Sequence, residues 1–180
     1  MANTTTEIPV DAFDTRIFNL WDKRWLALVS GDFSMGDYNA MTVAWGSMGI
    51  MWNLPFVMVV VRPTRYTFEF INKYMTFSLS AFPDEFRKAL NIIGTESGRE
   101  SDKIKTAGLT PVRLNKIEAP GFKEADLTFQ CRRIYWDDLD PLKFLLPSID
   151  NHYEKNDYHR MVFGEILSIQ GNAGKYSSFL

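Results

Sequence analysis

The sequence predicts one domain, spanning residues 1–180, that is mainly β with short α-helices, arranged as a mixed barrel or an α+β sheet. Three observations lead to this class. A chain of 180 residues can bury a core without disulfides or a structural metal. About six segments show strand patterns, with short helical patterns between them. The fingerprints GxGxxG after a strand and GxxxxGK[ST] are both missing, so a Rossmann fold or a P-loop is not expected.

The first predicted strands lie between residues 25 and 49. Residues 25–30 (WLALVS) form a short apolar run that enters the turn GDFSMGDYN. The next run, AMTVAWGSMG, alternates, which places Met41, Val43 and Trp45 on one face and small residues on the other. The small face admits either a flat ligand or close packing of a sheet or subunit.

A continuous apolar run leads into the first predicted helix. Residues 56–62 are nearly all apolar and β-branched, as expected for a central strand that is covered on both faces. We expect a helix over residues 66–74, capped by Thr64 or its neighbour. The alternating strand MTFSLSAF follows, and its row of hydroxyls is either exposed to solvent or placed at the polar edge of a ligand ring.

The second half of the chain combines two helices with two long strands. Residues 82–94 predict a helix with proline in its first turn and Gly94 as its terminator. A shorter helix is expected after a Ser101 cap, ending at Gly108. Long strands are predicted over residues 126–136 and 160–170, separated by a loop-rich segment.

Two arginines directly after the apolar strand predict an anion site. Arg62 and Arg65 offer planar, permanently charged forks of donors, and Thr64 and Thr67 add hydroxyls. A helix that begins near Thr64 would also direct free backbone N–H groups at the same anion. This combination fits a phosphate group, although surface arginines beside acidic neighbours are the ordinary alternative.

Composition limits the partners and the compartment. A net charge of -2 gives no general attraction to nucleic acid or anionic lipid, and the apolar run 54–61 is too short to span a bilayer. Neither nucleic acid nor a membrane is therefore expected as a partner. The single Cys131 lies in an alternating run and reads as a small buried residue in a reducing compartment. The N-terminus shows no secretory signal, so we expect a cytoplasmic protein. Aromatic residues make up 14%, which favours a subunit interface or a planar ligand.

Acid-base machinery is sparse. His152, His159, Glu154 and Asp157 share one hydrophilic segment, but their spacing matches no standard zinc motif, so no metal is expected. No GxSxG elbow occurs, and we predict no catalytic side chain. A bound redox cofactor would be consistent with this, because hydride transfer to a flavin needs stacking, orientation and local charge more than a protein nucleophile.

Several motifs, in order, resemble a known family. They are NAMTVAWGSMGIMWNLPFVMVVVRPTRYTFEFI, FSLSAF, SGRESDKIKTAGLTP and HRMVFGEI, which together cover roughly residues 39–169. The chain resembles the flavin reductase-like family of FMN-binding split β-barrels, which includes flavoredoxins. The resemblance implies a homodimer of split barrels that binds FMN noncovalently near the subunit interface.

The resemblance also implies a set of cofactor contacts. The residues expected to line the flavin ring and ribityl chain are Asn39, Met41, Thr42, Val43, Ala44 and Trp45. Those expected at the phosphate are Arg62, Arg65, Tyr66 and Thr67, and those expected beside the flavin are Ser78, Leu79, Ser80 and Ala81. Lys103 would add charge toward the phosphate or the reductant, and His159 matches a position near the nicotinamide in some relatives. The alternatives are a core role for Met41, Val43 and Trp45 and a surface role for Lys103.

The activity implied is an NAD(P)H-dependent flavin reductase that passes hydride from NADH or NADPH to bound FMN, with an unknown electron acceptor. The alternative is an FMN-binding electron carrier or sensor without a nicotinamide site, and a weaker one is an anion-binding domain that has lost flavin. Trp45 is bulkier than the small residue of many flavin reductases, which favours FMN as a retained prosthetic group rather than an exchanging substrate.

Overall fold

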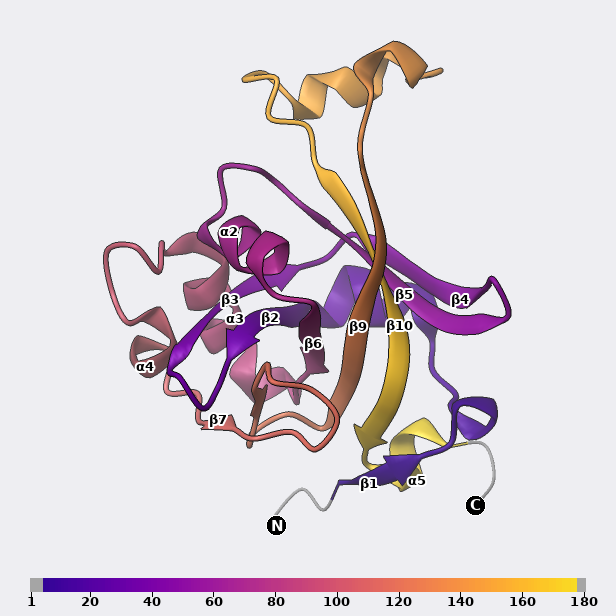
Figure 1. Cartoon of the computed structure of the whole chain (residues 1–180), viewed down its shortest axis with the longest axis vertical. Coiled ribbons are helices and arrows are strands. Elements are labelled where there is room, and N and C mark those ends of the chain that lie inside the picture. Colours follow the sequence, from indigo (N-terminus) through magenta and orange to yellow (C-terminus); the bar gives the residue numbers. More distant parts are fainter. Residues whose placement is uncertain (1–4, 178–180) are drawn as a thin grey trace.

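The computed structural model describes residues 5–177, in which one antiparallel sheet curls around a core and helices pack outside it (Figure 1). The strands of this sheet are β1 (Thr6–Ile8), β2 (Leu26–Asp32), β3 (Asp37–Val43), β4 (Gly46–Met51), β5 (Leu54–Val61), β6 (Thr76–Ala81), β9 (Leu127–Asp138) and β10 (Arg160–Gly171). A separate pair is formed by β7 (Pro111–Val112) and β8 (Gly121–Phe122). The helices are α1 (Ile17–Asn19), α2 (Tyr66–Lys73), α3 (Arg87–Thr95), α4 (Lys103–Thr106) and α5 (Ala173–Tyr176). A π-helical turn, η2, spans Leu20–Arg24, and 3₁₀ turns span Val10–Ala12 (η1), Asp84–Phe86 (η3), Pro141–Lys143 (η4) and Pro147–His152 (η5).

The sheet is split where the chain passes from β3 to β4. Its strand order is β3-β2-β6-β9-β10-β5-β4, with β1 added to β10. The two end strands, β3 and β4, are therefore neighbours in the chain but pair with different strands. Only Ala44 and Trp45 join them. An opening at this seam of the barrel follows directly from the topology.

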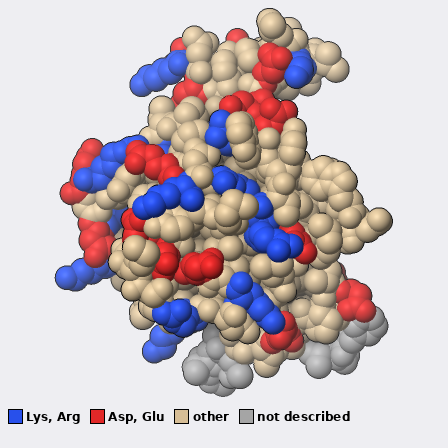
Figure 2. Space-filling model, viewed as in Figure 1, with Lys and Arg blue, Asp and Glu red and all other residues tan. Residues whose placement is uncertain are grey.

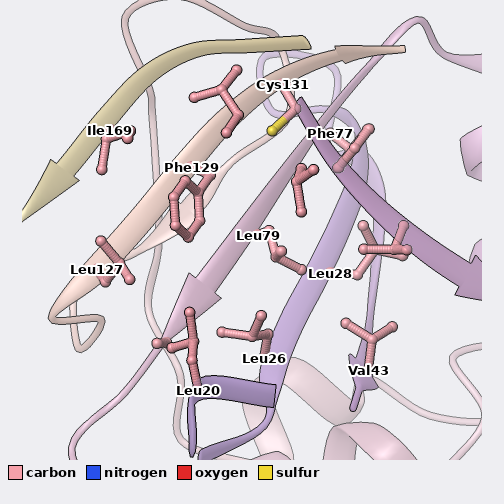
Figure 3. Packing of buried hydrophobic residues seen from close by; sticks show 14 of the residues in the cluster. Leu20, Leu26, Leu28, Val43, Phe77, Leu79, Leu127, Phe129, Cys131 and Ile169 are labelled. Atoms are coloured by element: carbon pink, nitrogen blue, oxygen red, sulfur yellow. The ribbon is translucent and has the colours of Figure 1, made fainter. Parts of the chain in front are cut away.

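The inner face of the curled sheet forms the main core. Figure 3 shows Leu28, Leu79, Phe129 and Cys131 converging from β2, β6 and β9, and each of them is 0% exposed. Cys131 is a small buried residue, as predicted, and burial raises the pKa of its thiol far above the ordinary value. This cluster draws on all the long strands, so a single core holds the barrel together.

A second apolar cluster covers the outer face of β2 and β3. Ala89, Leu90 and Ile93 project from one side of α3 and pack against Val29 and Ala40 of these strands. Their spacing of one, three and four residues places them on one helix face. The helix is thus held across β3, and its C-terminal end lies close to the seam of the barrel.

Several predicted boundaries differ from those of the structure. The predicted helix over 82–94 begins as a 3₁₀ turn and continues to Thr95, so Gly94 does not terminate it. Asp102 rather than Ser101 caps α4, accepting a hydrogen bond from the Lys105 N–H at 3.1 Å. The alternation over 40–49 breaks at the seam, where Trp45 is 48% exposed instead of sharing a buried face with Met41 and Val43.

The loop-rich segment between β9 and β10 folds as a projecting strap, defined here as residues 139–159. It lies beyond the end of the sheet at the top of Figure 1. Tyr153 is 4% exposed and stacks on Phe144, with Tyr158 beside both rings. In contrast, Leu142 and Leu145 are each 94% exposed. The strap therefore has a small aromatic core of its own, and two of its leucines are almost fully exposed.

No helix among residues 5–177 is long and apolar enough to span a bilayer. The N-terminal segment in which no secretory signal is expected begins outside the described residues.

We expect Phe129→Ala to lower the free energy of unfolding by about 3–5 kcal/mol, because a fully buried ring leaves a cavity in the barrel. Urea denaturation followed by circular dichroism measures this loss. The matched control is Phe18→Ala, since Phe18 is 87% exposed and its removal should change stability by less than about 0.5 kcal/mol. Equal effects of the two substitutions would contradict the assignment of the core.

Candidate functional site

A groove follows the seam between β3 and β4. Thr42 and Ala44 line two adjacent cavities, of 230 and 240 Å³, on its two sides. The first cavity is completed by Met41, Val43, Trp45, Val60, Arg62 and His159, and the second by Trp25, Leu90, Asn91, Gly94 and Thr95. A third cavity, of 930 Å³, shares Ala44 and Trp45 and extends past Gly46. Five of the six residues predicted to line the flavin therefore lie along one continuous groove.

Close backbone contacts hold the groove in shape. A Cβ on Gly94 would lie 3.0 Å from both Cβ and Oγ1 of Thr42, so α3 approaches β3 more closely than a larger residue would allow. The Thr42 hydroxyl donates to the Leu90 carbonyl, which ties the strand to the helix. Ala44 adds no bulk between the two cavities. A flat group can consequently come near the backbone at this position.

Two cations gather at the C-terminal end of α3. Arg65 donates to the Gly94 carbonyl, and Lys103 Nζ donates to the carbonyls of Ile93 at 2.9 Å and Glu96 at 3.0 Å. The last carbonyls of a helix carry partial negative charge, which accounts for both contacts. Within the described part of the chain, neither cation forms an ion pair with a carboxylate.

Burial and neighbouring positive charge both disfavour the charged forms of Lys103 and Arg65. Lys103 is only 3% exposed, and burial, followed by repulsion from Arg65 and partly offset by Glu96, lowers its pKa from 10.5 to about 8. Burial, and then the charge of Arg62, lower the pKa of Arg65 as well. A bound anion would relieve both effects, because it supplies the opposite charge that this corner lacks.

Arg65 and Lys103 form what we call the cation corner. Polar groups connect this corner with a 500 Å³ cavity. Asn39 and Lys103 both line it, and Asn39 Nδ2 donates to Thr67 Oγ1 at 2.8 Å. Gly98 lets the following loop reach Asn39, since a Cβ there would lie 2.2 Å from Asn39 Oδ1. Helix α2 starts directly after Arg65 without a side-chain cap, which leaves N–H groups of its first turn available. The predicted residues Asn39, Arg65, Tyr66, Thr67 and Lys103 therefore lie around one corner.

Arg62 has a different role from the one predicted at a phosphate. Its Nη1 forms 2.7 Å hydrogen bonds to both carboxylate oxygens of Asp157, and its Nη2 donates to the His152 carbonyl at 2.8 Å. The guanidinium also lies over the Tyr153 ring, 5.2 Å from its centroid. Sequence could not reveal this, because Asp157 and His152 reach Arg62 only through the folded strap. Arg62 holds the strap against the end of β5.

His159 lies beneath that contact at the edge of the groove. Its Nδ1 is 2.9 Å from the Tyr153 hydroxyl, and its ring lies 5.3 Å from Trp45 between ring centroids. Burial, followed by the charge of Arg62 and opposed by Asp157, lowers its pKa from 6.5 to about 4. His159 is accordingly neutral at pH 7 and offers a hydrogen-bonding ring rather than a cation.

Four predicted contacts lie away from the groove. Ser78, Leu79, Ser80 and Ala81 belong to β6, and all are 0% exposed. Ser78 donates to the Pro120 carbonyl at 2.6 Å, and the Ser80 hydroxyl is 3.0 Å from that of Thr128. The alternative of solvent exposure is wrong, because buried partners satisfy these hydroxyls. Strand β2 also separates β6 from β3, so these side chains do not line the groove.

Sequence reasoning missed several residues of the groove. Trp25, Leu90, Gly94 and Thr95 line it, although their local pattern predicts only a strand entrance and a helix. Arg99 lines the neighbouring cavity that contains Lys103, where it covers the Tyr66 ring at 4.7 Å from the centroid and pairs with Glu69. Their spacing carries no ligand signal, since only the docking of α3 beside β3 brings them together.

The arrangement suits binding more than proton transfer. Among residues 5–177, no group of three or more His, Cys, Asp or Glu side chains is placed to hold a metal ion. The groove instead combines small residues, aromatic rings and a neighbouring pair of cations. Such a site can hold a planar molecule with an anionic tail.

Comparisons with known proteins identify the family and the fold. The family model described as flavin reductase like domain matches residues 24–178. An uncharacterised protein from Pyrococcus abyssi is 32% identical over 114 residues, which cover 62% of each chain, so the match spans less than two thirds of that relative. Among solved structures, an FMN-binding domain of a flavin reductases-like enzyme from Shewanella baltica superposes with a TM-score of 0.70 at 14% identity, covering 96% of this chain and 80% of that one. A flavoredoxin from Methanosarcina acetivorans gives 0.65 at 21% identity, covering 96% and 81%. The chain therefore belongs to the flavin reductase-like family and has its split β-barrel fold.

Proposed function

We propose that this protein is an FMN-dependent oxidoreductase that binds FMN noncovalently and is reduced by NADH or NADPH. The observation that carries the proposal is the pair of buried cations, Arg65 and Lys103, beside a groove of small and aromatic residues. No carboxylate among the described residues forms an ion pair with either cation, so the corner fits a phosphate. The family supports a flavin as the ligand with that phosphate.

Each part of the site would have a separate role. Arg65, Lys103 and the first-turn N–H groups of α2 would hold the phosphate, with Asn39 and Thr67 fixing the strand beside the helix. Thr42 and Ala44 would let the ring approach the backbone along the seam. Trp45 would cover one side of it, supported by His159.

Bound FMN supplies the redox chemistry, accepting a hydride and passing electrons on. The protein's part is to orient the ring and to exclude water. Neutral His159 keeps the edge of the groove free of a further positive charge, and the strap held by Arg62 keeps His159 in place. Within this scheme Arg62 is a positioning residue, because its donors are occupied by Asp157 and His152.

A flavoredoxin-like electron carrier or sensor is the second candidate, favoured by the structural match to flavoredoxins. Anaerobic titration separates the two functions. An oxidoreductase should be yellow as purified, or after addition of FMN, and should be bleached by NADH or NADPH. A carrier would be bleached by dithionite but by neither nicotinamide. A colourless protein that takes up no FMN would contradict both.

A homodimer and a cytoplasmic location complete the proposal. The dimer is supported by apolar side chains that the described chain leaves exposed, including Leu142 and Leu145 of the strap and Trp52 at the tip of the β4–β5 hairpin. Figure 2 shows the surface over this hairpin as largely free of charged residues, whereas charges of both signs mix around the helices. The cytoplasmic location is supported by the single buried thiol. The physiological acceptor is a separate question.

We expect Arg65→Ala to weaken FMN binding by about 10- to 150-fold, because one charge-assisted contact to a phosphate is worth about 1.5–3 kcal/mol. Fluorescence titration of FMN measures the affinity, and circular dichroism verifies the fold. Arg113→Ala is the matched control, since Arg113 stacks on Phe33 away from the groove. An unchanged affinity in Arg65→Ala would place the phosphate elsewhere.

The affinity for FMN should also depend on pH through Lys103. The free protein loses the Lys103 proton near pH 8, and a bound phosphate favours the charged form. Affinity should therefore be full below pH 8 and fall above it, by up to about tenfold per pH unit. Lys103→Arg should remove this fall, because guanidinium stays charged. The same decline in Lys103→Arg and wild type would exclude Lys103 as its origin.

Sedimentation analysis tests the dimer. We expect the wild type to have twice the chain mass of 20.8 kDa. The double substitution Leu142→Glu and Leu145→Glu should shift it toward the monomer, because charges would enter an apolar interface. Lys155→Glu, at an exposed position of the same strap, is the control. A monomeric wild type would contradict the dimer.

A further inference from the structure

A further cavity with a basic lining, here called the basic cavity, adjoins the groove near the N-terminal end of α3. It has a volume of 510 Å³ and contains the side chains of Lys23, Arg24, Arg87 and Lys175, with Asp84 as the acid in its lining. Leu90 lines both this cavity and the groove cavity that contains Thr42 and Ala44. The two cavities are therefore neighbours across one side chain. None of the basic residues was singled out by the sequence.

The charges in this basic cavity are unequal. Asp126 contacts two of these cations. Its side chain is 5% exposed and accepts hydrogen bonds from Arg24 at 2.9 and 3.0 Å and from Lys175 at 2.7 Å. Two cations thus share one carboxylate, which also accepts from the Tyr176 hydroxyl at 3.0 Å. Among residues 5–177, the carboxylate that pairs with Lys23 is that of its exposed neighbour Asp22, at 2.6 Å. Positive charge remains in excess at the lining.

Arg87 is the cation most available to a ligand. Its guanidinium lies 3.3 Å from the centroid of the Trp25 ring, and its Nη1 donates to the Lys23 carbonyl at 2.6 Å. No carboxylate in the described part of the chain pairs with it. The stack holds the planar group in one orientation while leaving N–H donors of the fork free of a carboxylate partner.

Trp25, whose ring stacks on Arg87, has an unusual backbone conformation. Trp25 has φ 58° and ψ 160°, a combination that favours glycine, and it directly follows the π-helical turn Leu20–Arg24. Both features are over-represented at functional sites. Trp25 also lines two cavities of the groove. Through its stack with Arg87, this one residue therefore links the groove to the basic cavity.

We propose that the basic cavity binds the phosphate groups of the nucleotide reductant whose nicotinamide docks in the groove. This inference rests on the proposed function, since it assigns the anionic part of that same substrate. Arg87 and Lys23 contact the phosphates, and Trp25 positions Arg87. The fork geometry of a guanidinium suits a phosphate oxygen pair. Lys103 and Arg65 remain with the phosphate of the flavin.

The binding test uses ADP, which carries the phosphates but no redox group, titrated into the FMN-loaded protein by calorimetry. We expect ADP to bind and adenosine not to bind. Arg87→Gln should lower the affinity for ADP by about tenfold or more. Lys23→Gln should also lower the affinity for ADP. This substitution should leave the fold intact, because the Lys23 side chain is 71% exposed. Lys88→Gln, on the exposed side of the same helix, should change nothing. Equal losses in Lys88→Gln, or none in the other two variants, would overturn the proposal.

The kinetic test compares NADH and NADPH with 1-benzyl-1,4-dihydronicotinamide, a neutral donor without phosphates. Arg87→Gln should raise the KM for the nucleotide by about tenfold or more and leave reduction by the neutral donor unchanged. Equal effects on both donors would overturn the proposal, because they would place Arg87 at the ring. Flavin absorbance reports FMN binding separately. Failure of the proposed function can therefore be distinguished from failure of the phosphate assignment. A protein that binds FMN and ADP but is reduced by neither nucleotide would overturn the assignment to a reductant.

Discussion

The open seam of the barrel is the constraint on which the site depends. Because β3 and β4 end the sheet on opposite sides, Ala44 and Trp45 must cross between them without a strand partner of their own. Unpaired edges of a sheet need cover. Here α3 covers one side through Gly94 and Thr42, and the strap covers another through Arg62 and Asp157. The remaining space is the groove.

Positive charge is distributed around this groove in different ways. Arg62 is neutralised by Asp157 and serves the strap. Arg65 and Lys103 rest on helix carbonyls, whose partial charges only weakly oppose two full cations. Burial first, and then repulsion from Arg65, lower the pKa of Lys103, and Glu96 offsets this only in part. Sites that must accept an anion have this imbalance before the anion arrives, whereas a structural ion pair does not.

Contacts made by the strap fix the position of side chains at the groove. Its aromatic core around Tyr153 holds His159 through the hydrogen bond to Nδ1, and His159 in turn lies against Trp45. Burial beside Arg62 keeps the His159 ring neutral. Through Asp157, which lies 95 residues from Arg62 in the chain, the strap thereby shapes one wall of the groove. The exposed Leu142 and Leu145, which support the proposed dimer, belong to the same strap.

The sequence by itself determined the mainly β class, both long strands, the existence of helix α3 and the family, because period-two alternation, helix punctuation and ordered motifs are local signals. It also placed Asn39, Thr42, Ala44, Arg65 and Lys103 among the candidates, and these lie around the groove and its cation corner. Only the tertiary structure decided that Arg62 pairs with Asp157 and that Ser78 and Ser80 lie inside the barrel. It also brought Arg87 and Lys175 around the basic cavity, with Trp25 stacked on Arg87. The physical reason is that such pairings join residues far apart in the chain, and a carboxylate partner or a buried hydroxyl leaves no trace in local periodicity.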